Sequence, residues 1–308
     1  MKSLSIIVPC NNEEETIPVF FSTVNKIQKQ VSDYQFHYIF IDDGSKDKTL
    51  FQLRKLHQQF PKIVNYLSFS RPFGKEAGLY AGLRHAKGDL VAVMDVDLQD
   101  PPELLPRMIQ GIKAGYDVIG SRRVNRSGEG KIRSFFSNLF YKIINHLSDV
   151  PMKPGVRDYR LMTQPVVQAI LRLEEYNRFS KGIFEWVGFK TKYLDFKNRD
   201  RAAGKTSWSF GGLIRYSIQG IINFSQTPLT LAAWIGFLLA IAAFIALIII
   251  IIHKLLVDNS ASGWASLISV VLLIGGLQLF FLGVVGKYIA NIYTETKKRP
   301  LYIIKEAR

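Results

Sequence analysis

The sequence has a single cysteine, Cys10, among its 308 residues. One cysteine forms no disulfide within a chain, which excludes a disulfide-stapled fold and favours a reducing compartment. The first apolar run is not followed by G-x-G-x-x-G, and no G-x-x-x-x-G-K-S/T run occurs. These absences disfavour a dinucleotide-dependent oxidoreductase and a P-loop nucleotide hydrolase. Internal repeats and low-complexity tracts are lacking too.

Acidic residues are in the minority, because 40 Lys and Arg face 25 Asp and Glu and give a formal charge of +15. Most of this excess lies between residues 120 and 215, where 19 basic residues oppose 8 acidic ones. Nucleic-acid binding is one explanation of such a patch. An anionic membrane surface together with phosphorylated substrates explains it better, because the apolar runs follow directly. We therefore expect a membrane partner and no nucleic acid.

A cleavable signal peptide is not expected, since Lys2 leads at once into the strand-like run LSIIVP. Two long uncharged runs occur instead near the other end, at residues 229–252 and 264–286. At about 1.5 Å per helical residue, each exceeds the roughly 30 Å hydrocarbon core of a bilayer. The sequence therefore predicts two transmembrane helices, and two spans per chain leave helix surface for a homo-oligomer.

Basic residues after the second run predict the orientation of these helices. They are Lys287, Lys297, Lys298, Arg299, Lys305 and Arg308. The link between the runs, residues 253–263, carries only Lys254 and a histidine. We expect both termini to be cytoplasmic, the link to lie outside, and the protein to reside in the cell (plasma) membrane.

The first 121 residues alternate between short apolar runs and amphipathic stretches. The runs predicted as buried strands are 4–9, 37–42, 63–69, 90–95 and 116–121, and the predicted helices lie near 13–31, 47–59, 75–87 and 102–114. This alternation predicts an α/β fold with a mostly parallel sheet and helices on both faces. In such sheets ligands bind beyond the carboxyl ends of the strands.

The domain division follows from these patterns. We expect a cytoplasmic catalytic domain over residues 1–207, an interfacial juxtamembrane helix over 208–228, a transmembrane hairpin over 229–290 and a basic cytoplasmic tail over 291–308. Residues 131–149 are also amphipathic, with aromatic and basic side chains. That composition suits a helix in the membrane interface and a core-facing helix equally well.

The strongest chemical signal is DVDLQDPPE at residues 95–103, directly after a predicted strand. Asp95, Asp97 and Gln99 alternate and offer oxygen ligands, which hard divalent cations prefer. A metal there would neutralise the phosphates of a nucleotide and stabilise a leaving diphosphate. An acidic turn that caps the following helix is the alternative.

Two further strands end in hydrogen-bond acceptors. Asn11 to Glu15 follow the first strand, and Asp42 and Asp43 follow the second. Acceptors suit the N–H groups of a base and the hydroxyls of a ribose, although Glu14, Glu15 and Asp47 also read as helix caps. Together with the metal motif they indicate a nucleotide site.

These motifs, in this order, resemble glycosyltransferase family 2 with the GT-A fold, and the two apolar runs make the chain similar to its polyprenyl-phosphate glycosyltransferases. The resemblance covers essentially the whole chain. It implies that Mg²⁺ or Mn²⁺ is held by Asp95, Asp97 and Gln99. It also implies a nucleotide site made of Pro9, Asn11, Glu13, Asp42, Asp43 and Asp95. Many relatives have an aromatic residue where this sequence has Asn11.

Two more segments match the family. RDYRLM, residues 157–162, resembles the acceptor-side motif, whose aspartate is Asp158 here and is implied to be catalytic together with Asp97. RAAGKTSW, residues 201–208, resembles the loop that closes over the donor phosphates, with Ser207 where a lysine is usual. The candidates for gripping donor or acceptor phosphates are Arg122, Arg123, Arg133, Arg201 and Lys205.

The implied reaction is the inverting transfer of one sugar from a nucleotide-sugar to undecaprenyl (polyprenyl) phosphate, for cell-wall or surface-polysaccharide decoration. UDP-glucose or UDP-N-acetylglucosamine is the favoured donor, and GDP-mannose is the alternative. A phosphate acceptor is mostly dianionic at neutral pH and needs no strong base, so we expect Asp158 to orient it. A processive synthase is disfavoured because Q-x-x-R-W is lacking. A membrane-bound nucleotide-sugar sensor or assembly subunit is the non-enzymatic alternative.

Overall fold

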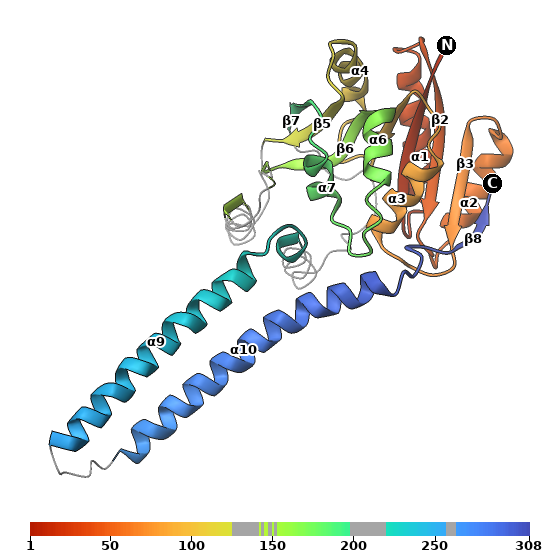
Figure 1. The fold of residues 1–308 in the computed structure, drawn as a ribbon. Helices are drawn as coiled ribbons and strands as arrows, with labels where there is room; N and C mark the ends of the chain where they lie inside the picture. Colours follow the sequence, from red (N-terminus) through yellow and green to blue (C-terminus); the bar gives the residue numbers. More distant parts are fainter. Residues whose placement is uncertain (125–141, 143–144, 147–149, 151–152, 198–219, 257–262) are drawn as a thin grey trace.

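The fold is an α/β domain from which two long helices project (Figure 1). The computed structural model describes residues 1–124, 142, 145–146, 150, 153–197, 220–256 and 263–308. Eight strands form one sheet in the order β7-β5-β6-β4-β1-β2-β3-β8. Their bounds are β1 Lys2–Cys10, β2 Tyr34–Asp42, β3 Val64–Phe69, β4 Leu90–Val93, β5 Val118–Arg123, β6 Val156–Thr163, β7 Thr191–Phe196 and β8 Ile304–Ala307.

Most neighbouring strands run parallel, as the alternating pattern predicts. The exceptions are β6, which pairs antiparallel with β4 and β5, and β8, which pairs antiparallel with β3. The domain helices are α1 Thr16–Gln28, α2 Thr49–Gln59, α3 Lys75–His85, the 3₁₀ turn η1 Pro102–Leu104, α4 Leu105–Lys113, α6 Gln164–Leu171 and α7 Ser180–Trp186. The five strands expected from apolar runs and the four expected helices are all present, with boundaries shifted by a few residues.

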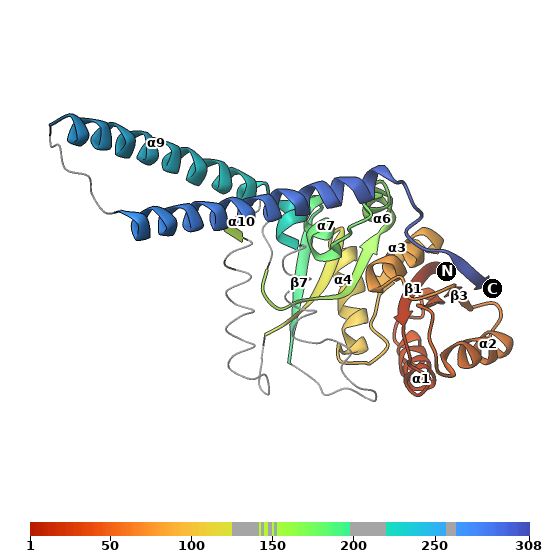
Figure 2. The same cartoon turned by 90° about the horizontal axis from the view of Figure 1, so that it is seen from below.

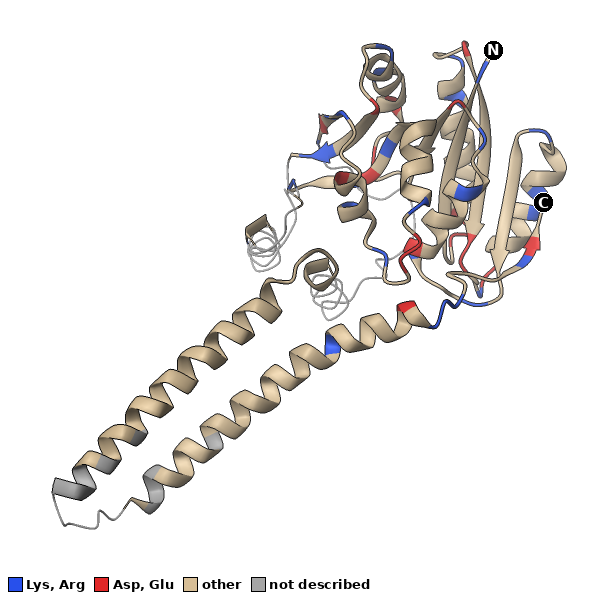
Figure 3. Cartoon of the chain, viewed as in Figure 1, with Lys and Arg blue, Asp and Glu red and all other residues tan. Residues whose placement is uncertain are grey.

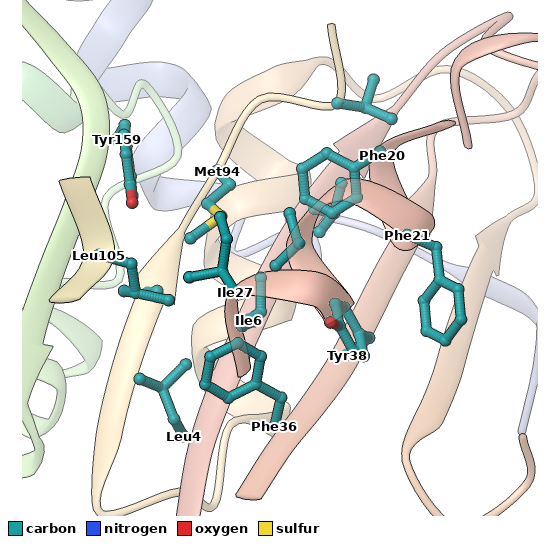
Figure 4. Close-up of a cluster of buried hydrophobic side chains, with 14 of the residues drawn as sticks. Leu4, Ile6, Phe20, Phe21, Ile27, Phe36, Tyr38, Met94, Leu105 and Tyr159 are labelled. Carbon is teal, nitrogen blue, oxygen red and sulfur yellow. The ribbon is translucent and has the colours of Figure 1, made fainter. Parts of the chain in front are cut away.

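The sheet has an apolar core on each face, because successive side chains of a strand point to opposite sides. On one face Ile6, Phe36 and Tyr38 pack with side chains of α1, α4 and β6, as Figure 4 shows for Phe20 and Leu105. On the other face, Ile7 and Ile41 pack with α3, α6 and α7. These two cores fix the strand ends that carry the candidate site.

Helix α3 lies very close to the sheet at one glycine. A Cβ on Gly82 would come within 2.2 Å of Ile7 Cγ2 and 3.0 Å of Ile41 Cδ1. One turn earlier, a Cβ on Gly78 would meet its nearest neighbours at 3.7 Å, an ordinary contact. Gly78 and Gly82 share a helix face, but only Gly78 has space for a methyl group. The β-branched side chain of Ile7 is stiff and cannot easily move away from Gly82.

We expect Gly82→Ala to lower the free energy of unfolding by about 1–2 kcal/mol, since overpacking outweighs the better helix propensity of alanine. Gly78→Ala is the matched control and should be neutral or slightly stabilising. Thermal and denaturant unfolding of both variants checks this, and equal stabilities would contradict the close approach of α3.

The segment after the second apolar helix is not a separate tail. The prediction of a basic tail over 291–308 differs from the structure, in which the helix continues to Thr296 and Ile304–Ala307 form the edge strand β8. Arg308, directly after β8, exchanges two backbone hydrogen bonds of 3.0 Å with Tyr66 of β3. The C-terminal residues therefore belong to the sheet of the α/β domain, beside β3 in Figure 1.

Side chains reinforce this attachment. Arg54 of α2 donates to Glu306 Oε1 through Nε at 2.9 Å and to Glu306 Oε2 through Nη2. The Tyr66 hydroxyl donates to Glu306 Oε1 at 2.5 Å. Tyr302, just before β8, stacks on Phe69 with ring centroids 5.1 Å apart. The hydrogen bonds from Arg54 and Tyr66 lower the pKa of Glu306 from 4.5 to about 2.

This shift predicts a pH dependence. A carboxyl whose folded pKa is lowered contributes stability above its unfolded pKa of 4.5 and loses it as pH falls towards about 2. We expect the unfolding temperature of the wild type to fall more steeply between these pH values than that of Glu306→Gln. Glu15→Gln, at an exposed carboxylate, is the charge-matched control, and parallel pH profiles for wild type and Glu306→Gln would contradict the prediction.

Two helices, α9 Thr227–Leu256 and α10 Trp264–Thr296, extend from the same side of the domain. Both views show them side by side (Figures 1 and 2). Each is long and apolar enough to cross a membrane by length and composition, over Thr227–Ile250 and Leu267–Thr296. Figure 3 shows the charged residues gathered on the α/β domain and at the domain end of α10, whereas the described projecting parts of the two helices carry almost none.

The domain end of α10 is held by specific contacts. Glu295 accepts hydrogen bonds from the backbone N–H groups of Tyr176 (2.8 Å) and Asn177 (3.3 Å). The Asn177 amide donates to the Thr294 hydroxyl at 2.8 Å. Tyr288 donates to the backbone carbonyl of Ser225, just before α9, at 2.8 Å. The loop before α7 therefore connects the last turn of α10 to the domain.

Candidate active site

The candidate site lies where the carboxyl ends of β1, β2 and β4 meet the amino end of β6. Antiparallel pairing places Val93 of β4 opposite Arg160 of β6. Asp95, two residues past the end of β4, and Asp158, two residues before Arg160 in β6, therefore lie near each other. The register of the sheet thus brings together the metal motif and the acceptor-side aspartate, which are far apart in the sequence.

One ammonium group connects these two carboxylates. Lys75 Nζ lies 2.7 Å from Asp95 Oδ1 and 2.5 Å from Asp158 Oδ2. All three side chains are largely but not fully covered, with exposed fractions of 34% for Lys75, 21% for Asp95 and 17% for Asp158. The centre of the site is therefore a shared ion pair that solvent and ligands still reach.

The position of Lys75 follows from the fold. It is the first residue of α3, which begins just after β3 and so starts at the carboxyl edge of the sheet. The preceding Gly74 has φ +95°, a conformation that glycine adopts without strain. The next residue, Glu76, accepts hydrogen bonds from the backbone N–H (3.0 Å) and hydroxyl of Ser180. The start of α3 is thereby fixed to the start of α7.

Charge sets the protonation states around this ion pair. Burial by itself would raise the pKa of Asp158, but Lys75 and Lys181 outweigh it and hold that pKa well below its ordinary value. Burial likewise opposes the charged form of Lys75, yet Asp158 and Asp95 raise its pKa above the ordinary one. Asp158 is therefore a stable anion and a poor proton acceptor.

Arg157 connects the metal motif to β6. Its guanidinium donates to Asp100 Oδ1 at 2.9 Å and to Gln99 Oε1 at 3.3 Å. Asp100 is 6% exposed, and burial raises its pKa to about 6 although Arg157 opposes the shift. Leu98, between Asp97 and Gln99, has φ +57°. A bulky residue in this region costs roughly 1–3 kcal/mol, and such strain is frequent at functional sites.

The predicted metal ligands can be compared with this geometry. Asp95, Asp97 and Gln99 follow β4 in one loop, and all offer oxygen atoms, which suits Mg²⁺ or Mn²⁺. In the part of the chain that is described, no three His, Cys, Asp or Glu side chains converge as a ready-made metal site. The amide oxygen of Gln99 accepts from Arg157, and Asp95 is paired with Lys75. The donor chemistry of Asp95, Asp97 and Gln99 fits a divalent cation, although in this structure one Asp95 oxygen is paired with the ammonium of Lys75.

The predicted nucleoside residues form one network of loops at the ends of β1 and β2. The Asn11 amide donates to the Asp43 carbonyl at 2.8 Å, and Asp42 accepts from Ser45 N–H (3.0 Å) and the Ser68 hydroxyl (2.7 Å). The Asp43 carboxylate accepts from the N–H groups of Phe73 (2.6 Å) and Gly74 (2.9 Å), so it fixes the loop that leads to Lys75.

Glu13 and Pro9 complete this group. Glu13 N–H donates to the Thr49 hydroxyl at 2.7 Å, and Glu13 Oε2 accepts from the Thr16 hydroxyl at 2.6 Å. Pro9 pairs with Ile41 in the parallel register of β1 and β2. The structure brings all these residues to one edge, and their contacts with a nucleoside stay a prediction.

The predicted phosphate-binding residues are only partly described. Arg122 of β5 forms a bidentate ion pair with Asp195 of β7, at 2.7 and 2.8 Å, on an exposed part of the sheet. Arg123, also in β5, donates its backbone N–H to the Gly155 carbonyl at 2.8 Å. Arg133, Arg201 and Lys205 lie outside the described residues, as do Ser207 and most of the two predicted interfacial helices.

Lys75 and Arg157 are site residues that were not predicted from the sequence. Lys75 stands at the first position of a predicted helix, where the positive end of the helix dipole disfavours a lysine. This unfavourable placement could have indicated that Lys75 has a functional role. Arg157 is the first residue of the acceptor-side motif, but a lone arginine there also reads as a surface residue.

The comparisons with known proteins identify the family of this chain. The profile described as Glycosyl transferase family 2 matches residues 5–171, more than half of the chain. The chain belongs to glycosyltransferase family 2. As a glycosyltransferase, it carries the predicted metal, nucleoside and acceptor motifs at one edge of its sheet.

Three relatives show how far this glycosyltransferase resembles known ones. The putative glycosyltransferase CsbB of Bacillus subtilis (strain 168) is 42% identical over 304 residues, covering 99% of this chain and 92% of that protein. The prophage bactoprenol glucosyl transferase homolog of Escherichia coli (strain K12) is 40% identical over 305 residues, covering 99% of both. The bactoprenol glucosyl transferase of Shigella phage SfII is 41% identical, covering 99% and 98%.

Among solved structures, mannosyl-3-phosphoglycerate synthase from Rubrobacter xylanophilus is similar with a TM-score of 0.51. The likeness covers 72% of this glycosyltransferase and 73% of that chain at 13% identity, so it concerns the fold. The mostly parallel GT-A-type sheet with flanking helices is thereby confirmed.

Proposed function

We propose that this glycosyltransferase transfers a single glucose from UDP-glucose to a polyprenyl phosphate, with inversion at the anomeric carbon, at the cytoplasmic face of a membrane. The juxtaposition of Asp95 and Asp158 around one cation carries the proposal, because it brings the donor-side and acceptor-side motifs to one point. Relatives named bactoprenol glucosyl transferases, similar over nearly the whole length, support the sugar and the lipid.

The membrane placement is supported by the chain path. α9 and α10 are long and apolar enough to cross a bilayer. β1 precedes them and β8 follows them in one sheet, so both ends of the chain lie on the same side. Two crossings satisfy this condition, and the basic residues after α10 favour the cytoplasmic side.

The chemistry is a displacement at the anomeric carbon. An oxygen of the acceptor phosphate forms the new bond to this carbon while the bond to the donor diphosphate breaks, and the nucleoside diphosphate leaves with the electron pair. The phosphate dianion is already a nucleophile, since its second pKa is roughly 6. Asp158, kept anionic by Lys75 and Lys181, serves to orient the cationic groups that receive the acceptor.

A divalent cation held by Asp95, Asp97 and Gln99 would supply charge neutralisation of the leaving diphosphate when bound. The chain's own residues keep that loop in place. Arg157 ties Gln99 and Asp100 to β6, and the Asp97 carboxylate accepts from the Gln99 N–H at 3.2 Å.

Incubation of the purified protein with undecaprenyl phosphate, Mg²⁺ or Mn²⁺ and labelled nucleotide-sugars tests the proposal. UDP-glucose should transfer label to a lipid-extractable product, and EDTA should prevent it. UDP-N-acetylglucosamine and GDP-mannose are the competing donors. Polymer in place of a single lipid-linked sugar, or donor binding without transfer, would contradict the proposal.

A further inference from the structure

The ion pair at the centre of the site is unusual in its components. Two carboxylates from different motifs share a single ammonium, with N–O distances of 2.7 and 2.5 Å. The backbone of Lys75 is anchored by its place in the fold, because Asp43 fixes the preceding loop and Glu76 fixes the start of α3 to Ser180 of α7. The architecture of α3 therefore fixes the backbone position from which the Lys75 side chain reaches both Asp95 and Asp158.

Asp95 is also the first residue of the predicted metal motif. A carboxylate oxygen that accepts an ammonium at 2.7 Å has its charge partly neutralised, and a nearby positive charge repels a divalent cation. The second carboxylate, Asp158, lies outside the metal loop on β6. Lys75 would therefore keep Asp158 as a partner if Asp95 coordinated a metal.

We propose that Lys75 is a built-in counter-ion that competes with the divalent metal for Asp95 and passes entirely to Asp158 when the metal binds. The inference rests on the proposed function, since it concerns the metal of that same site. It makes Lys75 a positioning residue that couples the state of the donor side to the acceptor side. Once the metal is in place, Lys75 no longer shares its charge with Asp95 and balances Asp158 together with Lys181.

This coupling has a consequence for the order of binding. Before the metal binds, Asp158 shares Lys75 with Asp95, so the Lys75–Asp158 pair does not yet have the arrangement that orients the acceptor. Metal binding releases the Asp95 contact and leaves the Lys75–Asp158 pair facing the acceptor. The acceptor is therefore expected to bind more tightly after metal and donor than before them.

Binding of Mn²⁺ alone, without nucleotide, tests the competition in the full-length protein in detergent. Free Mn²⁺ is measured by electron paramagnetic resonance during titration. Lys75→Met should lower the Kd for Mn²⁺ by about tenfold or more. A neighbouring unit charge shifts the proton-binding constant of a carboxylate by about one to three log units, and we expect a comparable effect on metal binding. Lys75→Arg keeps the charge and should stay close to wild type. Lys113→Met removes an exposed lysine paired with Asp33 at 3.2 Å and is the matched control.

The unfolding temperature is a second readout, and it tests the inference even if Lys75→Met is less stable than wild type. Lys75→Met leaves two close carboxylates without their shared cation, so its unfolding temperature should fall, and Mn²⁺ should raise it by more than in wild type. An unchanged or weaker Mn²⁺ affinity in Lys75→Met would overturn the inference. Weaker UDP binding with unchanged Mn²⁺ affinity would assign Lys75 to the nucleotide instead.

The outcomes separate this inference from the proposed function. Tighter Mn²⁺ binding by Lys75→Met, with no sugar transfer to lipid by the wild type, would uphold the counter-ion and refute the transferase reaction. Transfer by the wild type together with unchanged Mn²⁺ affinity in the variant would do the reverse.

Discussion

Asp97→Ala is expected to lower the kcat/KM of sugar transfer by about 100- to 1000-fold, the loss typical of removing one group that stabilises developing charge. Asp97 is the second carboxylate of the metal loop, and it also accepts from the Gln99 N–H at 3.2 Å. Its replacement by alanine would remove a predicted metal ligand and the hydrogen bond that holds the Gln99 backbone. Steady-state rates with UDP-glucose, at saturating lipid and over a range of Mn²⁺ concentrations, measure the effect.

Two controls make this result specific. Asp33→Ala removes an exposed carboxylate and should leave the rate unchanged. The unfolding temperature of Asp97→Ala without metal should stay near that of wild type, whereas Mn²⁺ should stabilise it less. A rate loss matched by global unfolding, or full activity after treatment with EDTA, would refute the metal role of Asp97.

Replacement of Asp158 is expected to separate orientation from proton transfer. Asp158→Ala should lower kcat by about 100-fold, since misplacement of reacting groups costs this much. Asp158→Asn keeps an oxygen that can accept from Lys75 and should retain turnover within about tenfold of wild type. The reason is that the pKa of Asp158 is held below its ordinary value, so the carboxylate is unsuited to take a proton.

Rates of both variants measured across pH check this interpretation. Wild type and Asp158→Asn should both gain rate as the acceptor phosphate becomes dianionic, around its second pKa of roughly 6. An Asp158→Asn enzyme as inactive as Asp158→Ala, or one whose loss tracks the ionisation of the acceptor phosphate, would show that the carboxylate does more than orient.

The parallel half of the sheet could be predicted because its strands are buried on both faces. Runs such as LSIIVP and LVAVMD carry few polar residues, and this is typical of such strands. The polar residues at their carboxyl ends were therefore placed correctly at one edge. Their common location follows from this reasoning alone, and their contacts with a sugar donor stay a prediction.

The antiparallel strands could not be predicted in the same way. β6 holds Arg157, Asp158 and Arg160, and such charges usually indicate a surface loop. Arg160 is nevertheless only 2% exposed, because its guanidinium stacks on the Phe184 ring at 3.6 Å and donates to backbone carbonyls. A partner from another element makes that burial favourable, and periodicity within β6 gives no sign of it.

β8 was missed for a different reason. It has four residues, and three of them are exposed because it covers the sheet edge and faces solvent. Its stability comes from β3, Arg54 and Tyr66, which lie more than two hundred residues away. Lys75 was missed likewise, because its two partners are brought to it by strand register and not by sequence neighbours.

The attachment of β8 has a consequence for how the enzyme would meet its acceptor. The α/β domain is joined to the helix pair twice, at Thr227 where α9 begins and through β8 after α10 ends. A domain on one tether swings freely, but one held at two points keeps its height and tilt. A lipid diffusing in the membrane plane would then meet the site at a constant distance, so the encounter would depend on lipid density per unit area. Cutting the chain between Thr296 and β8 would leave the single attachment at Thr227, so the height and tilt of the domain would then vary.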